Sequence, residues 1–208
     1  MKIEIKSFAN GERISDENCF CNLMSNGEVA FGKNINPNIK WYDYHENTKS
    51  FSLICVDPDV PSVGDDVNQE GKTVPKDLPR TNFYHWVLAN IPLNVNEIKA
   101  GDDSKEITSK GKKSGLTQYG AIAGINDYTN WFAGDEQMAG YYGGYDGPCP
   151  PWNDERIHHY YFIVFALNCE KIDISGNFTG KDLLAAIENH IIDKAEYVGT
   201  YTLNKNLK

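Results

Sequence analysis

The chain has 208 residues, of which 40% are hydrophobic and 24% are charged, values that are ordinary for a folded protein of one domain or two small ones. Its formal net charge of −9 argues against nucleic acid and anionic membrane surfaces as bulk electrostatic partners. Because the sequence shows neither a signal-peptide-like start nor an apolar run of transmembrane length, we expect a cytoplasmic location.

Strand signals dominate the chain. Residues 2–8 and 50–57 alternate apolar and polar side chains, as half-buried strands do. "FYHWVLANI" at 83–91 and "HHYYFIVFAL" at 158–167 are apolar on both faces, which is typical of central strands that are covered on each side. "EYVGTYTL" at 196–203 predicts one more strand. The series predicts a mainly β protein.

One helix is predicted near the C-terminus. Thr179 stands three residues before Asp182, which is the spacing of a capping box. Residues 183–191 then place four leucine and isoleucine side chains along one helical face. We interpret His190, which lies beside that apolar stripe, as a helix-edge residue without chemistry.

Three long connections separate these elements, at residues 61–81, 99–118 and 124–152. Loops beyond about 15 residues are uncommon unless they are functional or disordered. The third connection contains six glycines and seven aromatic residues, and we expect it to be ordered because large rings need a surface to pack against.

The five cysteines are odd in number and widely scattered, which favours reduced thiols over a disulfide framework. Cys19 and Cys21 flank Phe20 and have the spacing of half a metal site. No second pair with ligand spacing follows, so we do not predict a metal there.

Two aspartates stand where the predicted strand 50–57 stops. Asp57 and Asp59 belong to "DPDVP", in which Pro58 and Pro61 restrict the backbone. An aspartate in this position is most often a simple turn former. The pair indicates a candidate site only in combination with the histidines described next.

Two histidines begin central strands. His85 lies two positions before Val87, so the period of a strand predicts that its ring faces an apolar surface. His158 shares a face with Tyr160, whereas His159 points to the other side. Such a histidine is often only a core residue. Carboxylates, imidazoles and a phenol at neighbouring strand ends nevertheless favour one small polar pocket.

Four motifs in fixed order carry a family resemblance: "DPDVP", "FYHWVLANIP", "GIND", and "GPCPP" followed by "HHYYFIVFAL". They resemble the phosphatidylethanolamine-binding protein family, most closely its bacterial branch, which is often labelled Raf-kinase-inhibitor-like. The resemblance runs from "INPNIKW" to the closing "EYVGTYTL". It implies a single mainly β domain over residues 1–208, with two antiparallel β-sheets, a few peripheral helices, no cofactor, and one small metal-free pocket for an anion.

The resemblance also implies the pocket residues and the function. Transferred position by position, the ligand-binding residues are Asp57, Asp59, Pro61, His85, Gly147, Pro148, His158 and Tyr160. The implied function is a binding protein, not an enzyme, for a small anionic or zwitterionic ligand such as a phospholipid head group. Modulation of a signalling partner stays open.

The chain departs from the family pattern in three places. His159 stands where the family usually has Arg, and Val60 stands where it usually has Ala. The stretch between "GIND" and "GPCPP" is longer than in typical bacterial relatives, and residues 129–142 account for the difference. We expect this aromatic insertion to cover or narrow the pocket.

Two enzyme hypotheses remain as alternatives. In the first, Cys149 acts as a nucleophile with His85 or His158 as its base. Its position between prolines in "GPCPP" offers nothing that would lower the pKa of its thiol, so we expect only a small, dispensable wall residue. In the second, Asp57, Asp59, His85 and His158 hold a metal ion for hydrolysis, a ligand set that would suit zinc.

Two further expectations concern association and pH. The resemblance implies a homodimer, to which Trp131 and Phe132 of the insertion would add apolar surface.

An anion that binds beside two aspartates needs positive charge or donors to offset their repulsion. These could come from a protonated His85 or His158, a shared proton, backbone N–H groups or a ligand ammonium group. Either histidine would make phosphate bind more tightly at about pH 5.5 than at pH 8, because an unperturbed histidine titrates near 6.5.

Overall fold

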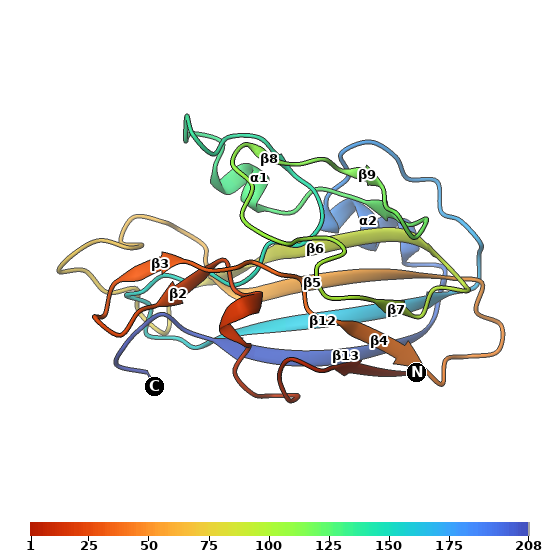
Figure 1. Ribbon diagram of the computed structural model, residues 1–208, viewed down its shortest axis with the longest axis horizontal. Helices are drawn as coiled ribbons and strands as arrows, with labels where there is room; N and C mark the ends of the chain where they lie inside the picture. Colours follow the sequence, from red (N-terminus) through yellow and green to blue (C-terminus); the bar gives the residue numbers. More distant parts are fainter. Residues whose placement is uncertain (208) are drawn as a thin grey trace.

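The main sheet has six antiparallel strands, as the computed structural model shows (Figure 1). Their order is β13 (Ile191–Tyr201), β12 (His158–Leu167), β5 (Ser50–Pro61), β6 (Arg80–Pro92), β10 (Ile122–Ala123) and β9 (Gly115–Leu116). The structure describes residues 1–207, so Lys208, the last residue of the predicted domain, lies outside it. The predicted strands "FYHWVLANI" and "HHYYFIVFAL" are both internal to this sheet, which confirms their central position.

A second antiparallel sheet has the order β1 (Lys2–Ile5), β4 (Ile39–Tyr42) and β7 (Glu97–Ile98). The remaining strands form two pairs, β2 (Cys21–Leu23) with β3 (Val29–Phe31), and β8 (Gly111–Lys112) with β11 (Tyr141–Tyr142). The helices are a 3-10 turn at Asp16–Asn18, α1 (Tyr128–Trp131) and α2 (Gly180–Ile187). The predicted mainly β fold with two antiparallel sheets and a few peripheral helices is confirmed.

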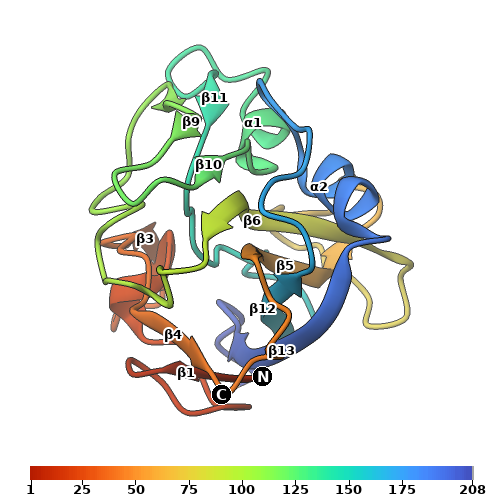
Figure 2. The ribbon, with the colours of Figure 1, turned by 90° about the vertical axis from the view of Figure 1, so that its right-hand side faces the viewer.

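The main sheet is covered on both faces (Figure 2). On one face, Leu183 and Ile187 of α2 join a core with residues of the sheet that include Val87. On the other face, Trp41 of β4 packs against Phe51 of β5 with ring centroids 5.4 Å apart. Burial on both faces explains why the central strands read as continuous apolar runs.

An irregularity in β6 controls where His85 points. Between Cys55 and Val56, one step of β5 corresponds to two steps of β6, so that His85 is an extra residue in a β-bulge. The ring of His85 faces an apolar surface, as predicted, but this is not the face of Val87 that the simple period of a strand implied. Val87 belongs to the core beneath α2, whereas the ring of His85 lies 5.2 Å from that of Tyr160 in the opposite core.

A second irregularity separates the two aspartates. Strand β5 continues through Pro61, so Asp57 and Asp59 lie within a strand and not after its end, as the sequence had suggested. From Asp57 to Val60 the strand advances three residues while β6 advances two. The extra residue removes Asp59 from the face that carries Asp57.

Helix α2 begins as predicted and ends early. The Thr179 hydroxyl accepts the N–H of Asp182, and the Asp182 carboxylate accepts the N–H of Thr179, which confirms the capping box. The predicted helix was too long, however, because Ile191 already starts β13. His190 therefore lies in the connection between helix and strand, partly exposed, with Nδ1 3.1 Å from Asn168 Oδ1.

The cysteines differ from the prediction of reduced thiols. Cys21 of β2 and Cys149 form a disulfide that closes a loop of sequence separation 128. Cys19, Cys55 and Cys169 are free. Two cysteines so far apart in sequence give no local pattern, and only the fold brings them together.

Among residues 1–207, no helix is long and apolar enough to cross a membrane.

Candidate ligand-binding cavity

A cavity of about 290 Å³ lies between the main sheet and the loops that cover it. Five of the predicted pocket residues form its sheet side, namely Asp57, Pro61, His85, His158 and Tyr160. The loop side consists of residues 149–151, α1 and the neighbouring Phe132, and the β2–β3 region. A larger groove of about 980 Å³ runs past Trp152 and Leu203, but it lacks the buried histidines and aspartates.

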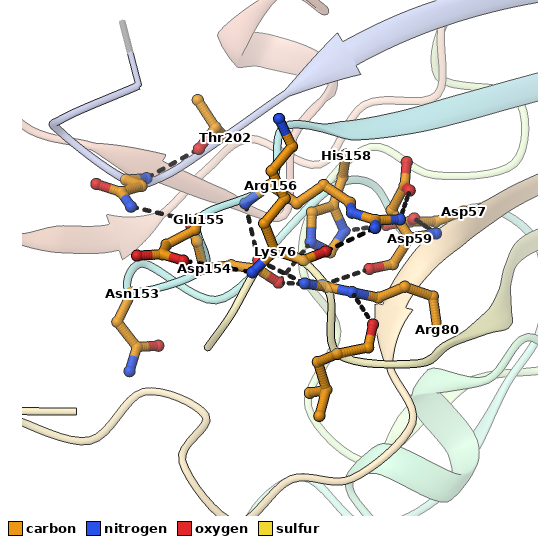
Figure 3. A network of polar contacts seen from close by, with 12 residues as sticks. Asp57, Asp59, Lys76, Arg80, Asn153, Asp154, Glu155, Arg156, His158 and Thr202 are labelled. Atoms are coloured by element: carbon orange, nitrogen blue, oxygen red, sulfur yellow. Dashed lines mark hydrogen bonds and ion pairs between the residues drawn. The ribbon is translucent and has the colours of Figure 1, made fainter. Parts of the chain in front are cut away.

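His158 is held between two carboxylates (Figure 3). Its Nδ1 donates to Asp57 Oδ2 at 2.7 Å, and its Nε2 donates to Asp154 Oδ2 at 3.1 Å. Burial alone would lower the pKa of this imidazole, but the charge of Asp57 and the hydrogen bonds to both carboxylates outweigh it and raise the pKa to about 9. His158 is therefore an imidazolium at neutral pH, with both N–H groups already used.

Arg80 completes a chain of alternating charges. Its guanidinium contacts both oxygens of Asp154, at 2.5 and 3.1 Å, and both side chains are almost fully buried. Burial opposes ionisation of Asp154, but the hydrogen bonds from His158 and Arg80 lower the pKa of its carboxyl group below the ordinary value. Two cations and two carboxylates, those of Asp154 and Asp57, alternate along this chain and sum to zero.

His85 differs from His158 in its hydrogen-bond partner and in its charge. Its Nδ1 donates to the backbone carbonyl of Asp146 at 2.7 Å, which fixes the proton on that nitrogen because a carbonyl oxygen only accepts. Burial lowers the pKa of His85, and the nearby charge of Asp57 only partly opposes this. The ring is neutral at pH 7, and its Nε2 has no hydrogen-bond partner among residues 1–207. This nitrogen is free to meet a ligand.

A buried polar cluster fixes the segment that orients His85. The Asp146 carboxylate accepts hydrogen bonds from Asn34 at 2.7 Å, Asn126 at 2.8 Å and Lys112 at 2.7 Å. The Asp146 N–H also donates to the carbonyl of His85 at 3.0 Å. Asp146 and His85 are thus tied together at both backbone and ring, so the tautomer of His85 is set by well-held atoms.

Asp59 lies outside the cavity. Its carboxylate accepts from Arg156 Nη1 at 3.0 Å and pairs with His159 Nδ1 at 2.8 Å. The hydrogen bonds from His159 and Arg156 overcome burial and lower the pKa of Asp59. Figure 3 shows Asp59 beside Arg156.

The family model described as phosphatidylethanolamine-binding protein matches residues 4–202. The chain belongs to this family. Membership supports a ligand-binding protein in general.

Curated relatives and solved structures match nearly the whole length of this chain. A UPF0098 protein from Aquifex aeolicus is 30% identical over 97% of this chain and 88% of its own length. The UPF0098 protein YbcL from Escherichia coli is 28% identical over 96% of this chain and 85% of its own. A crystal structure of YbcL, described as a new member of the mammalian PEBP family, has a TM-score of 0.66 at 25% identity and covers 97% of both chains.

A likeness in fold alone comes from a putative family homologue of Chlamydia trachomatis, CT736. Its crystal structure has a TM-score of 0.63 at 24% identity, covering 96% of this chain and 95% of its own.

Within this member of the family, the "GPCPP" wall differs in detail from the prediction. Gly147 and Pro148 do not line the cavity; Cys149, Pro150 and Pro151 do. Gly147 instead holds a lining residue in place, because its carbonyl accepts the hydroxyl of Tyr128 at 2.8 Å. A Cβ atom at Gly147 would come within 2.0 Å of the Asn18 carbonyl oxygen, so the close approach requires glycine.

Two residues of the predicted insertion line the cavity. Trp131 and Phe132 line it together with Tyr128 of α1, and the rings of Tyr128 and Phe132 stack with centroids 5.5 Å apart. Sequence reasoning did not find Asp154 or Arg80, which hold His158. A signal existed for Asp154, four residues before His158, but it is too common to stand out.

The two enzyme alternatives meet different obstacles. Cys149 is bonded to Cys21 and has no free thiol with which to attack a substrate. Both ring nitrogens of His158 already contact carboxylates, and no group of three His, Cys, Asp or Glu residues within 1–207 is arranged to hold a metal ion. His85 Nε2 is the one predicted imidazole nitrogen that faces the cavity without a described partner.

Proposed function

We propose that this chain binds a small phosphorylated or carboxylated ligand, such as a phospholipid head group, in the cavity beside His85, and that it is not an enzyme. The observation that supports this most directly is the orientation of His85. Its Nδ1 is fixed on the Asp146 carbonyl, so that Nε2 is presented to the cavity. When an anion approaches, this nitrogen takes up a proton and donates a charge-assisted hydrogen bond to it.

Charge in the cavity favours a zwitterion over a bare dianion. His158 is cationic, but both of its N–H groups serve Asp57 and Asp154, so it offers no donor to the ligand. In the described part of the chain, residues 1–207, no lysine or arginine lines the cavity. A ligand with its own positive group brings the charge that this site lacks, and an ethanolamine- or choline-type head group has this property. An effect on a signalling partner through such binding stays a hypothesis.

Isothermal titration with inorganic phosphate and phosphoethanolamine tests the proposal. We expect both to bind the wild type and phosphoethanolamine to bind more tightly. His85→Ala should weaken both by about tenfold or more, because a hydrogen bond to a charged group contributes about 1.5–3 kcal/mol. His190→Ala, which changes a partly exposed histidine that does not line the cavity, should leave both unchanged. Equal affinities of wild type and His85→Ala would refute the site.

We also propose that the chain works where the Cys21–Cys149 bond stays oxidised. Disulfides persist in oxidising compartments and are rare in the cytosol outside redox-active sites. The bond therefore weighs against the cytoplasmic location predicted from the sequence. Labelling of free thiols in acid-quenched cells should modify three of the five cysteines, and labelling of all five would restore that prediction.

Homodimer formation is a separate proposal. Of the two insertion residues named for it, Trp131 is 55% exposed, whereas Phe132 is partly buried against Tyr128. The apolar area available for a dimer is thus smaller than the sequence suggested. Light scattering at high concentration should show a dimer, and a monomer would remove this proposal.

A further inference from the structure

The mouth of the cavity is built from aromatic rings. Seven of them line it: Phe20, Phe31, Phe83, Tyr128, Trp131, Phe132 and Tyr160. Phe31 is 68% exposed and Trp131 is 55% exposed, so these two rings lie at the opening, whereas Tyr160 is buried near the histidines. The cavity passes from polar groups at its floor to an aromatic rim.

The rings are held in a connected array. The ring of Phe20 lies 5.7 Å from that of Phe31, edge to face, and 4.6 Å from that of Tyr128, stacked. Phe83 meets Tyr128 edge to face at 5.2 Å. The Cys21–Cys149 disulfide fastens the segment carrying Phe20 to residues 149–151 of the same loop side. Aromatic faces are therefore preset around the opening, and such faces attract cations through their quadrupoles.

Acceptors for the hydrogens of a primary ammonium group are scarce in the cavity. Among residues 1–207, Asp57 is the only carboxylate that lines it, and its Oδ1 accepts the Asp59 N–H while its Oδ2 accepts from His158. The Oδ1 of Asn68 accepts the N–H of Trp152. With a ligand phosphate on His85, the Tyr160 phenol is the main polar side-chain group left near the floor. A primary ammonium, with three donors, would lose water contacts that this lining does not replace.

We propose that the aromatic mouth selects ligands whose cationic end is a quaternary ammonium group over ligands with a primary ammonium group. The proposal rests on the proposed binding of a phosphorylated head group at His85. A quaternary ammonium has no N–H donors to satisfy and carries its charge on methyl groups that pack against ring faces. The selectivity is specific to this chain to the extent that Trp131 comes from its insertion at residues 129–142.

Three phosphate esters separate the contributions: phosphocholine, phosphoethanolamine, and neohexyl phosphate, in which carbon replaces the choline nitrogen. All three carry the same anionic end. We expect phosphocholine to bind about tenfold more tightly than either of the others, within the range of desolvated cation–π contacts. Neohexyl phosphate measures what apolar contact gives without the positive charge.

Ring-removing variants locate the effect. Trp131→Leu and Phe31→Leu keep apolar bulk at the exposed rim but remove the π face. Each should reduce the preference for phosphocholine over neohexyl phosphate to about threefold or less, with the affinity for neohexyl phosphate changed less than about twofold. Tyr141→Leu is the matched control, since Tyr141 is 61% exposed in the same insertion but does not line the cavity. It should change nothing.

The outcomes also distinguish this inference from the proposed function. If the three esters bind equally, or phosphoethanolamine binds best, the ammonium selectivity is refuted while phosphate binding at His85 stands. If none of the esters binds, both proposals fail. If phosphocholine and neohexyl phosphate bind equally and more tightly than phosphoethanolamine, the mouth recognises apolar bulk and the cation–π assignment is overturned.

Discussion

The two sides of the cavity are built on different principles. The sheet side presents Asp57, His85 and His158 from the long, paired strands β5, β6 and β12, and buried hydrogen bonds hold the three side chains. The loop side has short elements and rings, and its covalent link is the Cys21–Cys149 disulfide. The sheet side therefore sets charge and proton positions, and the loop side sets shape and access.

The sheet side itself contains an instructive contrast. His85 and His158 are both buried and line one cavity, yet they have opposite charge states. His85 meets a neutral carbonyl, and burial lowers its pKa. His158 meets two carboxylates, which overcome burial and raise its pKa to about 9. The hydrogen-bond partner, more than burial, decides which imidazole is charged.

The largest expected effect concerns the loop side. The double variant Cys21→Ser, Cys149→Ser should lower the free energy of unfolding by about 3–5 kcal/mol, because the disulfide closes a loop of 128 residues and restricts the unfolded chain. Urea denaturation measures this. Wild type reduced with dithiothreitol should match the variant, and Cys169→Ser, which changes a free cysteine, should match oxidised wild type. A variant as stable as oxidised wild type would contradict the role of the bond.

The next effect tests the charged histidine. Because the folded-state pKa of His158 is raised from 6.5 to about 9, its stabilisation is fully present below pH 6.5 and is lost as pH rises through about 9. The shift corresponds to about 3 kcal/mol of unfolding free energy. Denaturation at several pH values from 6 to 10 should show this loss. His158→Gln should be less stable at pH 6 and should lack this part of the slope, whereas His85→Ala should keep it.

The sheet side could largely be predicted from the sequence. Apolar runs with histidines at their starts located β6 and β12, and the family motifs brought His85, His158, Tyr160 and Asp57 to one pocket. What failed was detail that depends on bulges. Simple alternation cannot show that His85 is an extra residue in its strand.

The loop side could be predicted only in outline. Its aromatic density indicated an ordered segment, and the insertion that was expected to cover or narrow the pocket contributes Trp131 and Phe132 to its lining. The pairing of Cys21 with Cys149 depends on contacts across most of the chain, and nothing local encodes it. The sequence did not indicate the charge state of His158 either. Asp154 contacts His158, and Arg80 contacts Asp154, only in the folded chain.

A smaller effect concerns ligand binding and pH. The sequence suggested that either histidine would titrate between pH 5.5 and 8. With its pKa near 9, His158 stays charged over this window, whereas His85 is neutral and gains a proton when it binds an anion. Phosphate affinity, corrected for the ligand's own titration, should rise severalfold from pH 8 to 5.5 in wild type. His158→Gln should keep this dependence and His85→Ala should abolish it. The reverse result would exchange their roles.

The smallest effect concerns the two aspartates of "DPDVP". Asp57 lines the cavity, whereas Asp59 pairs with Arg156 and His159 outside it. Asp59→Asn should therefore change the affinity for phosphoethanolamine by less than about twofold, and should cost at most about 1 kcal/mol of stability, since its ion pairs are partly exposed. Asp57→Asn removes a charge that holds His158 at the cavity floor and should change the affinity several times more. Calorimetric titration of both variants makes the comparison. If Asp59→Asn has the larger effect, the bulge between the two residues does not separate them functionally, and the carboxylate outside the cavity takes part in binding after all.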